Sequence, residues 1–258
     1  MSLCAALREG VPVIGSWLNT ASPIAAELMA ACGFDFLAVD AEHSAVDLPR
    51  TQALFQAIRS GSPDCAALVR LPGTDYSLTK RYMDAGAEGV IAPMVNSAHE
   101  AREVVRAVKY PPLGERGVGF CRDNCYGMTL DETVAAANER TLVCVQIEHV
   151  KAVEDIDAIL SVEGVDAAFI GPYDLSASMG ITARFDDPEF LAALDKVFEA
   201  CRAHDVAPGI HVVRPDPWEA AARIEEGYRL IAYSLDITML ETSCREGLAE
   251  IRKATGPR

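Results

Sequence analysis

Four apolar runs of the sequence lead into side chains that could carry out chemistry. The residues at or just after the ends of these runs are Asp40-Ala-Glu-His43, Arg70, Gln146-Ile-Glu148 and Gly171-Pro-Tyr-Asp174. If the runs are parallel strands of a barrel, their carboxyl ends open onto one face, and this is where barrel enzymes place their active sites. We therefore expect these polar groups to meet at a single opening.

Glu148 and Asp174 are the candidate ligands of a metal ion. A hard divalent cation such as Mg²⁺ is typically held by one or two carboxylates, while waters and substrate oxygens complete its coordination. The pair therefore predicts a divalent-metal site. Mg²⁺ and Mn²⁺ are the expected occupants, with Co²⁺ as a further option, and the general affinity order of divalent metals does not select among them.

Arg70, His43 and Asp40 are the candidate catalytic groups beside the metal pair. The guanidinium of Arg70 would present fixed donors to a carboxylate or a developing oxyanion. His43 would act as a base that Asp40 orients. Each charge also has a structural interpretation, because ion-pair networks collect in clefts: Asp40 could cap a loop, Arg70 and Glu148 could pair, and Glu42 reads as a rim charge. Four charged strand ends on one rim favour the functional interpretation.

The remaining histidines and the two tryptophans carry less weight. His211 could line the site and His149 could support a metal ligand, but either could equally be a packed neutral histidine. Trp17, at the end of the first run, is expected to wall the pocket. The others are expected to be solvated (His99), to cap a helix end (His204) and to pack against the body (Trp218).

Lysine placement argues against imine chemistry. The chain has five lysines, and none lies within an apolar strand run. A Schiff-base lysine needs desolvation to lower its pKa, and the lysine closest to a strand end, Lys151, is expected to begin a helix. No glycine-rich loop follows the last two apolar runs, where barrels often hold a phosphate. The sequence thus favours metal-assisted carbonyl chemistry on a substrate without phosphate.

A repeating unit positions these side chains: a helical stretch ends at a glycine, an apolar run follows, and a polar loop leads to the next helix cap. Glycines typical of a helix end with a left-handed residue are Gly33, Gly61, Gly86, Gly164 and Gly227. Helix starts are predicted by capping boxes at Ser97–Glu100 and Thr129–Glu132, and by cap–proline pairs at Ser22-Pro23, Asp187-Pro188 and Asp216-Pro217.

Eight apolar runs are predicted as strands. They are Val13–Leu18, Phe36–Asp40, Ala66–Leu71, Gly89–Val95, Leu142–Ile147, Ala167–Ile170, Val206–Val212 and Leu230–Tyr233. Nearly continuous apolar runs are typical of a parallel sheet buried on both faces. Eight alternations predict a (β/α)8 barrel, a TIM barrel. The alternative is a doubly wound open sheet, which usually has a glycine-rich first turn; here no glycine follows Gly15 in that turn.

The chain shows no linker, so we predict a single barrel domain over residues 1–258. Its longest insertion, Tyr110–Leu130, lies between the fourth and fifth predicted strands, and long loops in compact domains are usually functional. The net charge of −15 argues against nucleic acid and anionic membranes as partners, and no apolar run is long enough to span a bilayer. Eight scattered cysteines without a C-x-x-C pair indicate reduced thiols and a cytoplasmic location.

With these residues in place, the chain resembles the HpcH/HpaI aldolases, metal-dependent class II enzymes that use pyruvate. The resemblance runs from Gly15-Ser-Trp17 to the last specific motif. The stretches that carry it most specifically are Tyr110-Pro-Pro-Leu-Gly-Glu-Arg-Gly-Val-Gly119, Gln146-Ile-Glu148 and Gly171-Pro-Tyr-Asp-Leu-Ser-Ala-Ser-Met-Gly180.

The resemblance implies a barrel that holds a divalent cation at Glu148 and Asp174. Pyruvate would chelate this ion, which would stabilise the enolate. Arg70 would stabilise the enolate oxygen, and His43 with Asp40 would relay the proton, while Gln146 would contact pyruvate. The backbone around Pro172 and Tyr173 would hold the pyruvate carboxylate, with Trp17 as the pocket wall. The resemblance further implies a homo-oligomer, a hexamer or trimer, in which a C-terminal helix from about Asp236 to Lys253 packs on a neighbouring subunit.

The predicted reaction is reversible aldol cleavage of a 4-hydroxy-2-oxo acid to pyruvate and an aldehyde. Departures from the family pattern at 119–126 and 44–47 border the expected aldehyde position and leave the aldehyde open. Two alternatives remain. A lyase for a citramalyl- or malyl-CoA type thioester would need a basic surface, which the charge disfavours. A non-catalytic binder of 2-oxo acids would not need the Asp40 and His43 pair.

Overall fold

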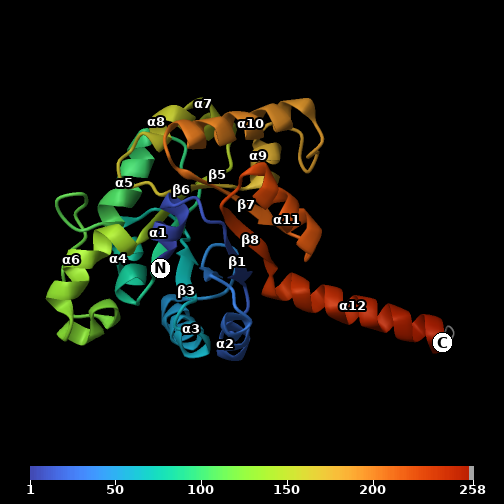
Figure 1. The fold of residues 1–258 in the computed structure, drawn as a ribbon, viewed down its shortest axis with the longest axis horizontal. Helices are drawn as coiled ribbons and strands as arrows, with labels where there is room; N and C mark the ends of the chain where they lie inside the picture. Colours follow the sequence, from blue (N-terminus) through green and yellow to red (C-terminus); the bar gives the residue numbers. More distant parts are fainter. Residues whose placement is uncertain (256–258) are drawn as a thin grey trace.

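The computed structural model, which describes residues 1–255, shows a closed barrel of eight parallel strands in sequence order, with β1 paired to β8 (Figure 1). The strands are β1 Val13–Leu18, β2 Phe36–Asp40, β3 Ala66–Arg70, β4 Gly89–Ala92, β5 Leu142–Ile147, β6 Ala167–Ile170, β7 Ala207–Val212 and β8 Leu230–Leu235. The predicted (β/α)8 barrel is confirmed, and the doubly wound alternative is wrong because β8 closes on β1.

Helices follow the strands, and all but the last, α12, lie against the outside of the barrel (Figure 1). They are α2 Pro23–Ala31, α3 Leu48–Gly61, α4 Tyr76–Asp84, α5 Ala98–Val108, α6 Leu130–Arg140, α7 Val150–Glu154, α8 Ile156–Leu160, α9 Pro172–Ser178, α10 Pro188–Ala203, α11 Pro217–Glu226 and α12 Asp236–Thr255; α1 Leu3–Arg8 precedes β1, and the 3₁₀ helix η1 Arg122–Gly127 lies in the long insertion. No helix among the described residues is long and apolar enough to cross a bilayer.

The strands are buried on both faces, as their continuous apolar runs predict. One buried cluster fills the barrel interior and includes Trp17, Phe36 and Phe169, with Leu7 of α1 joining it. A second cluster lies between the strands and the surrounding helices. In the interior, the Trp17 and Phe169 rings meet edge to face with their centroids 5.7 Å apart. The barrel is therefore a packed core, and space for a substrate exists only at its ends.

Four of the eight predicted strands, β1, β2, β5 and β6, have the predicted boundaries, whereas β3, β4, β7 and β8 differ from the prediction by one to three residues at one end. The strand predicted to continue to Val95 ends at Ala92, because Met94 has a positive φ of 53°. Gly61 does not adopt a left-handed conformation; it ends α3 where a Cβ atom would lie 2.2 Å from the backbone oxygen of Glu27 in α2. The glycine thus serves the close packing of two helices.

Most of the predicted helix caps are also confirmed, and one is wrong. Ser22, Asp187 and Asp216 accept backbone hydrogen bonds at the starts of α2, α10 and α11, as predicted. Ser97 also caps its helix by accepting from the Glu100 backbone N–H. The predicted capping box at Thr129 is wrong, because its hydroxyl makes no capping bond and lies 3.2 Å from the Thr133 hydroxyl.

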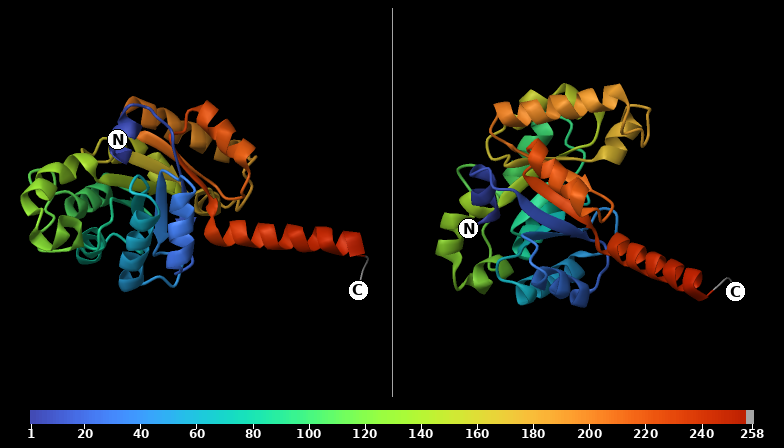
Figure 2. Two further views of the ribbon diagram at one scale, coloured as in Figure 1. Left: turned by 60° about the horizontal axis from the view of Figure 1, so that its bottom comes forward. Right: turned by 45° about the vertical axis from the view of Figure 1, so that its right-hand side comes forward.

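Helix α12 departs from the compact arrangement of the other helices. It begins directly after β8 and extends away from the barrel, as all three views show (Figures 1 and 2). Apolar side chains along it are exposed, including Leu240 and Ile251 at 63% and 59%. An isolated helix gains little from burial, so this projecting helix differs physically from the helices that pack on the barrel.

Candidate active site

Asp40 and Arg70 form the central pair at the carboxyl end of the barrel. They are lateral neighbours in the β2–β3 register. Arg70 donates from Nε and Nη2 to the two oxygens of Asp40 at 2.9 and 2.6 Å. Burial alone would raise the pKa of Asp40, but the hydrogen bonds and charge of Arg70, with two backbone N–H donors, lower it overall. The pair holds the guanidinium in one orientation.

His43 does not meet Asp40 in the way the sequence predicts. Only the His43 backbone N–H donates to Asp40, at 3.1 Å. The ring is largely exposed, and its Nε2 lies 3.6 Å from a carboxylate oxygen of Glu42. The ring partner of His43 is therefore Glu42, because the turn after β2 directs the ring outward while Asp40 points into the barrel mouth.

Glu42 is more than a rim charge. Its side chain is 19% exposed and lies 3.4 Å from Arg70 Nε. Burial raises its pKa, and although Arg70 and His43 oppose this shift, the neighbouring charges of Asp40 and Asp174 add to it. Sequence reasoning underrated this residue, although its position two residues after the buried Asp40 was an available signal.

Glu148 follows β5 and is almost fully buried. One oxygen accepts a hydrogen bond from the Met94 backbone N–H at 2.6 Å, and the other accepts from the Gln146 side-chain amide. Burial, with the charges of Glu42 and Asp174, raises the pKa of Glu148 to about 7, against the lowering effects of Met94 and Arg70. A buried carboxylate among other carboxylates is stabilised by a nearby cation.

Backbone details shape the setting of Glu148. Gly171, just after β6, leaves room for it, since a Cβ atom there would lie 2.9 Å from Glu148 Oε2. Met94, which donates to Glu148, has a left-handed φ of 53°. Non-glycine residues in that region are strained and gather at functional sites. Met94 could not be identified from the residue pattern, because only its backbone participates.

Asp174, with Pro172 and Tyr173, lies in the first turn of α9, directly after β6. Asp174 is exposed, and its charge acts on both Glu148 and Glu42. Among the described residues, no group of three or more His, Cys, Asp and Glu side chains has the arrangement of a metal site. Carboxylate oxygens such as those of Glu148 and Asp174 are donors that suit a hard cation, which commonly takes its other ligands from water and substrate.

Trp17 and His211 form the floor below the charged groups. The guanidinium carbon of Arg70 lies 4.6 Å from the Trp17 ring centroid, and His211 packs edge-on against the same ring. Burial and the charge of Arg70 lower the pKa of His211 to about 4, so this ring is neutral near pH 7. Trp17 is only 2% exposed, and it lies beneath the site more than beside it.

Five buried polar atoms at this end of the barrel have no partner, and others, such as Arg116 Nε and Nη1, lie elsewhere among the described residues. Within residues 1–255, no hydrogen bond is made by Trp17 Nε1, Asn19 Oδ1, Glu42 Oε2, Gln146 Oε1 or His211 Nε2. Native proteins leave few such groups, and each needs an explanation. The five around Arg70 and Glu148 indicate a surface prepared for a polar ligand and its waters.

The other predicted residues take structural roles. His149 caps α7 by accepting from the Lys151 backbone N–H at 3.1 Å, and Lys151 is exposed in that helix. His204 ends α10 and lies 3.2 Å from Asp157. The prediction that Trp218 packs against the body is wrong, because it is 82% exposed. The sequence analysis overlooked Lys109, which is buried at the opposite end of the barrel.

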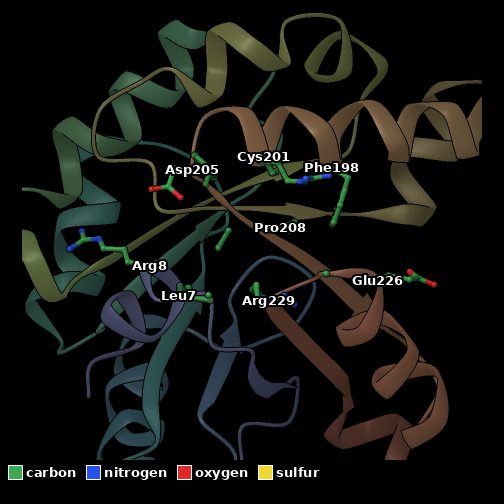
Figure 3. Close-up of a pocket in the computed structure, with 13 residues that line it drawn as sticks. Leu7, Arg8, Phe198, Cys201, Asp205, Pro208, Glu226 and Arg229 are labelled. Carbon is green, nitrogen blue, oxygen red and sulfur yellow. The ribbon is translucent and has the colours of Figure 1, made fainter.

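A cavity of about 450 Å³ lies near the amino ends of β7 and β8, between α1, α10 and α11 (Figure 3). Two of its arginines are already engaged: Arg8 pairs with Glu139 and Asp166, and Arg229 donates to backbone carbonyls. Burial raises the pKa of its thiol, Cys201, to about 12. The residues predicted to form the site lie at the other end of the barrel, where Asp40 and Arg70 meet.

A closed (β/α)8 barrel with charged groups gathered at its carboxyl end is the architecture of a barrel enzyme. The sequence matches the family described as HpcH/HpaI aldolase/citrate lyase over residues 13–242. The chain therefore belongs to this family and is a carbon–carbon lyase.

Individual relatives agree with this assignment. A 4-hydroxy-2-oxovalerate aldolase of Novosphingobium aromaticivorans is 37% identical over 256 residues, which cover 98% of this chain and 95% of the relative. A hydroxypyruvate/pyruvate aldolase of Roseobacter denitrificans is 35% identical over 91% of this chain and 90% of its own. The crystal structure of an HpcH/HpaI aldolase from Desulfitobacterium hafniense DCB-2 superposes with a TM-score of 0.89 at 36% identity, covering 98% and 97% of the two chains.

Proposed function

We propose that this enzyme catalyses the reversible, divalent-metal-dependent aldol cleavage of a 4-hydroxy-2-oxo acid to pyruvate and an aldehyde. The observation that carries the proposal is the position of Glu148. Its buried carboxylate accepts hydrogen bonds from the Met94 backbone N–H and the Gln146 amide, and the charges of Glu42, Asp174 and Arg70 act on it. The relatives named as aldolases of pyruvate and of 4-hydroxy-2-oxovalerate support this substrate class.

Glu148 and Asp174 would hold the cation, for which Mg²⁺ and Mn²⁺ are the candidates. When bound, such an ion acts as a Lewis acid that polarises the 2-oxo group of the substrate. The backbone at Pro172 and Tyr173 and the amide of Gln146 would orient the oxo-acid end. One N–H of the Gln146 amide donates to Glu148, and the second N–H could donate to an oxygen of the oxo-acid.

Arg70 would stabilise the negative charge that develops on the 2-oxo oxygen as the C3–C4 bond breaks. Asp40 occupies Nε and Nη2 of the guanidinium, and Nη1 makes no hydrogen bond within residues 1–255. A preorganised donor of this kind contributes to catalysis because it does not have to reorient during the reaction.

His43 would take the proton from the C4 hydroxyl during cleavage, directly or through one water, and return it in the aldol direction. Its exposed ring can reach a substrate at the barrel mouth, and Glu42 would orient it and stabilise its charged form. In this arrangement Asp40 acts on Arg70 and on the backbone of His43, whereas Glu42 takes the part that the sequence analysis assigned to Asp40.

The proposal also includes a homo-oligomer, a trimer or hexamer, in which α12 packs on a neighbouring subunit. The exposed apolar residues along the projecting helix support it. All eight cysteines are free, in agreement with the reducing cytoplasm as the proposed location. Light scattering should show a mass of three or six chains, and truncation after Asp236 should reduce it.

Exchange of pyruvate methyl protons in D₂O, followed by NMR, tests the function without a choice of aldehyde. We expect exchange that is lost with chelator and restored by Mn²⁺ or Mg²⁺, and cleavage of 4-hydroxy-2-oxovalerate with the same dependence. The Glu148→Gln and His43→Ala variants should each lose cleavage. Cleavage that persists undiminished in the presence of a chelator would contradict the metal proposal.

A further inference from the structure

The first residue of the projecting helix α12 is built into the barrel mouth. Asp236 is 8% exposed, in contrast to the helix that it begins. Its carboxylate accepts hydrogen bonds from the backbone N–H groups of Asn19 and Thr20, each at 2.9 Å, and from the Thr20 hydroxyl at 2.5 Å. A third backbone donor, Ile237, completes the set at 2.8 Å. Asp236 therefore fixes the loop between β1 and α2.

The loop that Asp236 holds in turn supports the central pair of the site. The Asn19 side-chain amide donates to Asp40 Oδ2 at 2.7 Å. The same oxygen accepts from Arg70 Nη2 at 2.6 Å. Asp40 is fully buried, so the direction of its carboxylate is set by these neighbours and not by solvent. The contacts form a continuous path from Asp236 through Asn19 and Asp40 to Arg70.

We propose that Asp236 and Asn19 are positioning residues that hold the Arg70 guanidinium in its catalytic orientation through Asp40. The inference rests on the proposed function, because it assigns a purpose to that orientation. A donor acts on a developing charge only within narrow limits of distance and angle. The backbone N–H groups of Glu42 and His43 hold Asp40 Oδ1, whereas Oδ2 accepts from Asn19 and Arg70. Without the Asn19 amide, Oδ2 would be held by Arg70 alone, and the carboxylate and the guanidinium could turn together. The root of α12 is thereby part of the support of the active site.

The fluorescence of Trp17 can report the position of the Arg70 guanidinium without a measurement of enzyme activity. The guanidinium lies over its ring at 4.6 Å, and the other tryptophan of the chain, Trp218, is 82% exposed. In a Trp218→Phe background, Trp17 is the only tryptophan, and excitation selective for tryptophan reports on it alone. We expect Asn19→Ala to change its emission intensity, and we expect the same substitution to cause no further change once Arg70→Leu has removed the guanidinium.

Kinetics supply the second readout. Asp236→Asn and Asn19→Ala should each lower kcat by about 10- to 100-fold, the scale expected for a misplaced catalytic group, with KM changed by less than about threefold. In an Arg70→Lys background, either substitution should lower kcat by less than about threefold further, because residues that act through one group are not additive. The matched control is Asp187→Asn, which alters a helix-capping carboxylate of α10 and should leave emission and kcat unchanged.

The outcomes separate the two proposals. Equal kcat losses in the wild-type and Arg70→Lys backgrounds, or an emission change that survives Arg70→Leu, would overturn the positioning role. If Asp236→Asn does not fold, Asn19→Ala still tests the path, since it keeps all four bonds to Asp236. If the emission results are as expected but no cleavage of any 4-hydroxy-2-oxo acid is found, the positioning path stands and the proposed function fails.

Discussion

The Lys109 cluster at the amino end of the barrel and the Arg70 cluster at the carboxyl end each bury a cation beside carboxylate groups, yet they differ in how completely their polar atoms are bonded. At the amino end, Lys109 Nζ donates to the carbonyls of Asn138 and Thr141 and to Asp166. Asp166 also accepts from Arg8 and from the Val143 N–H. None of these groups is left with an unpartnered buried side-chain atom.

At the carboxyl end, Arg70 and Asp40 are paired, but the surrounding atoms of Gln146, Asn19 and Glu42 keep unused hydrogen-bonding capacity. The comparison teaches that burial and charge do not by themselves identify an active site. A cluster whose bonds are complete stabilises the fold, whereas a cluster that is held rigidly and left incomplete can receive a ligand.

Replacement of Lys109 provides the strongest test of this contrast. Lys109→Met keeps the length of the side chain but leaves Asp166 and two carbonyls without their donor. Loss of one partner of a buried pair costs about 3–5 kcal/mol, and we expect this decrease in the free energy of unfolding by urea, with kcat of the folded enzyme unchanged. Lys196→Met, at an exposed position, is the control. A stable Lys109→Met enzyme with reduced kcat would invalidate the comparison.

Arg70→Lys is the corresponding change at the carboxyl end. Lysine keeps the charge but not the planar fork that binds Asp40 through two nitrogens. We expect kcat to fall about 10²- to 10³-fold, as for the loss of an oxyanion donor. Thermal unfolding should change little, because the charge remains beside Asp40. A large loss of stability with little loss of kcat would place Arg70 with the structural cluster.

His211 predicts how stability depends on pH. Its pKa is about 4 when folded, against an ordinary value of 6.5. The unfolded chain therefore binds more protons between these values, and stability falls as pH decreases through this window. We expect a loss of about 2 kcal/mol from pH 7 to pH 5 in urea unfolding. His211→Phe should remove this part of the dependence, whereas His99→Phe should retain it; equal slopes in the two variants would refute the assignment.

The smallest expected effect concerns the caps of α5 and α6. It tests whether the observed hydrogen bond or the residue type alone determines how much a cap stabilises a helix. Ser97 caps α5 with its hydroxyl, but Thr129 makes no such bond before α6. Ser97→Ala should reduce the free energy of unfolding by about 1 kcal/mol. Thr129→Ala should reduce it by clearly less, since only the contact to Thr133 is lost. Equal losses would show that sequence motif, and not observed geometry, is the better guide to helix capping here.

Much of the fold was predictable because its determinants are local. Continuous apolar runs define strands buried on both faces, and β1, β2, β5 and β6 have the predicted boundaries. The charged residues that follow them were found for the same reason, since a change from apolar to polar residues marks a strand end. Where Met94 ends β4 early, the cause is a strained backbone angle, which no side-chain pattern reveals.

The sequence by itself determined the barrel, the order of its elements and the set of polar residues at its carboxyl end. Tertiary structure alone decided their partners: Arg70 holds Asp40 across two strands, Glu42 faces the His43 ring, and Lys109 is buried where the sequence shows only a helix end. The physical reason is that strand formation depends on neighbours along the chain, whereas hydrogen-bond partners and burial depend on strand register and on the direction of side chains from distant segments.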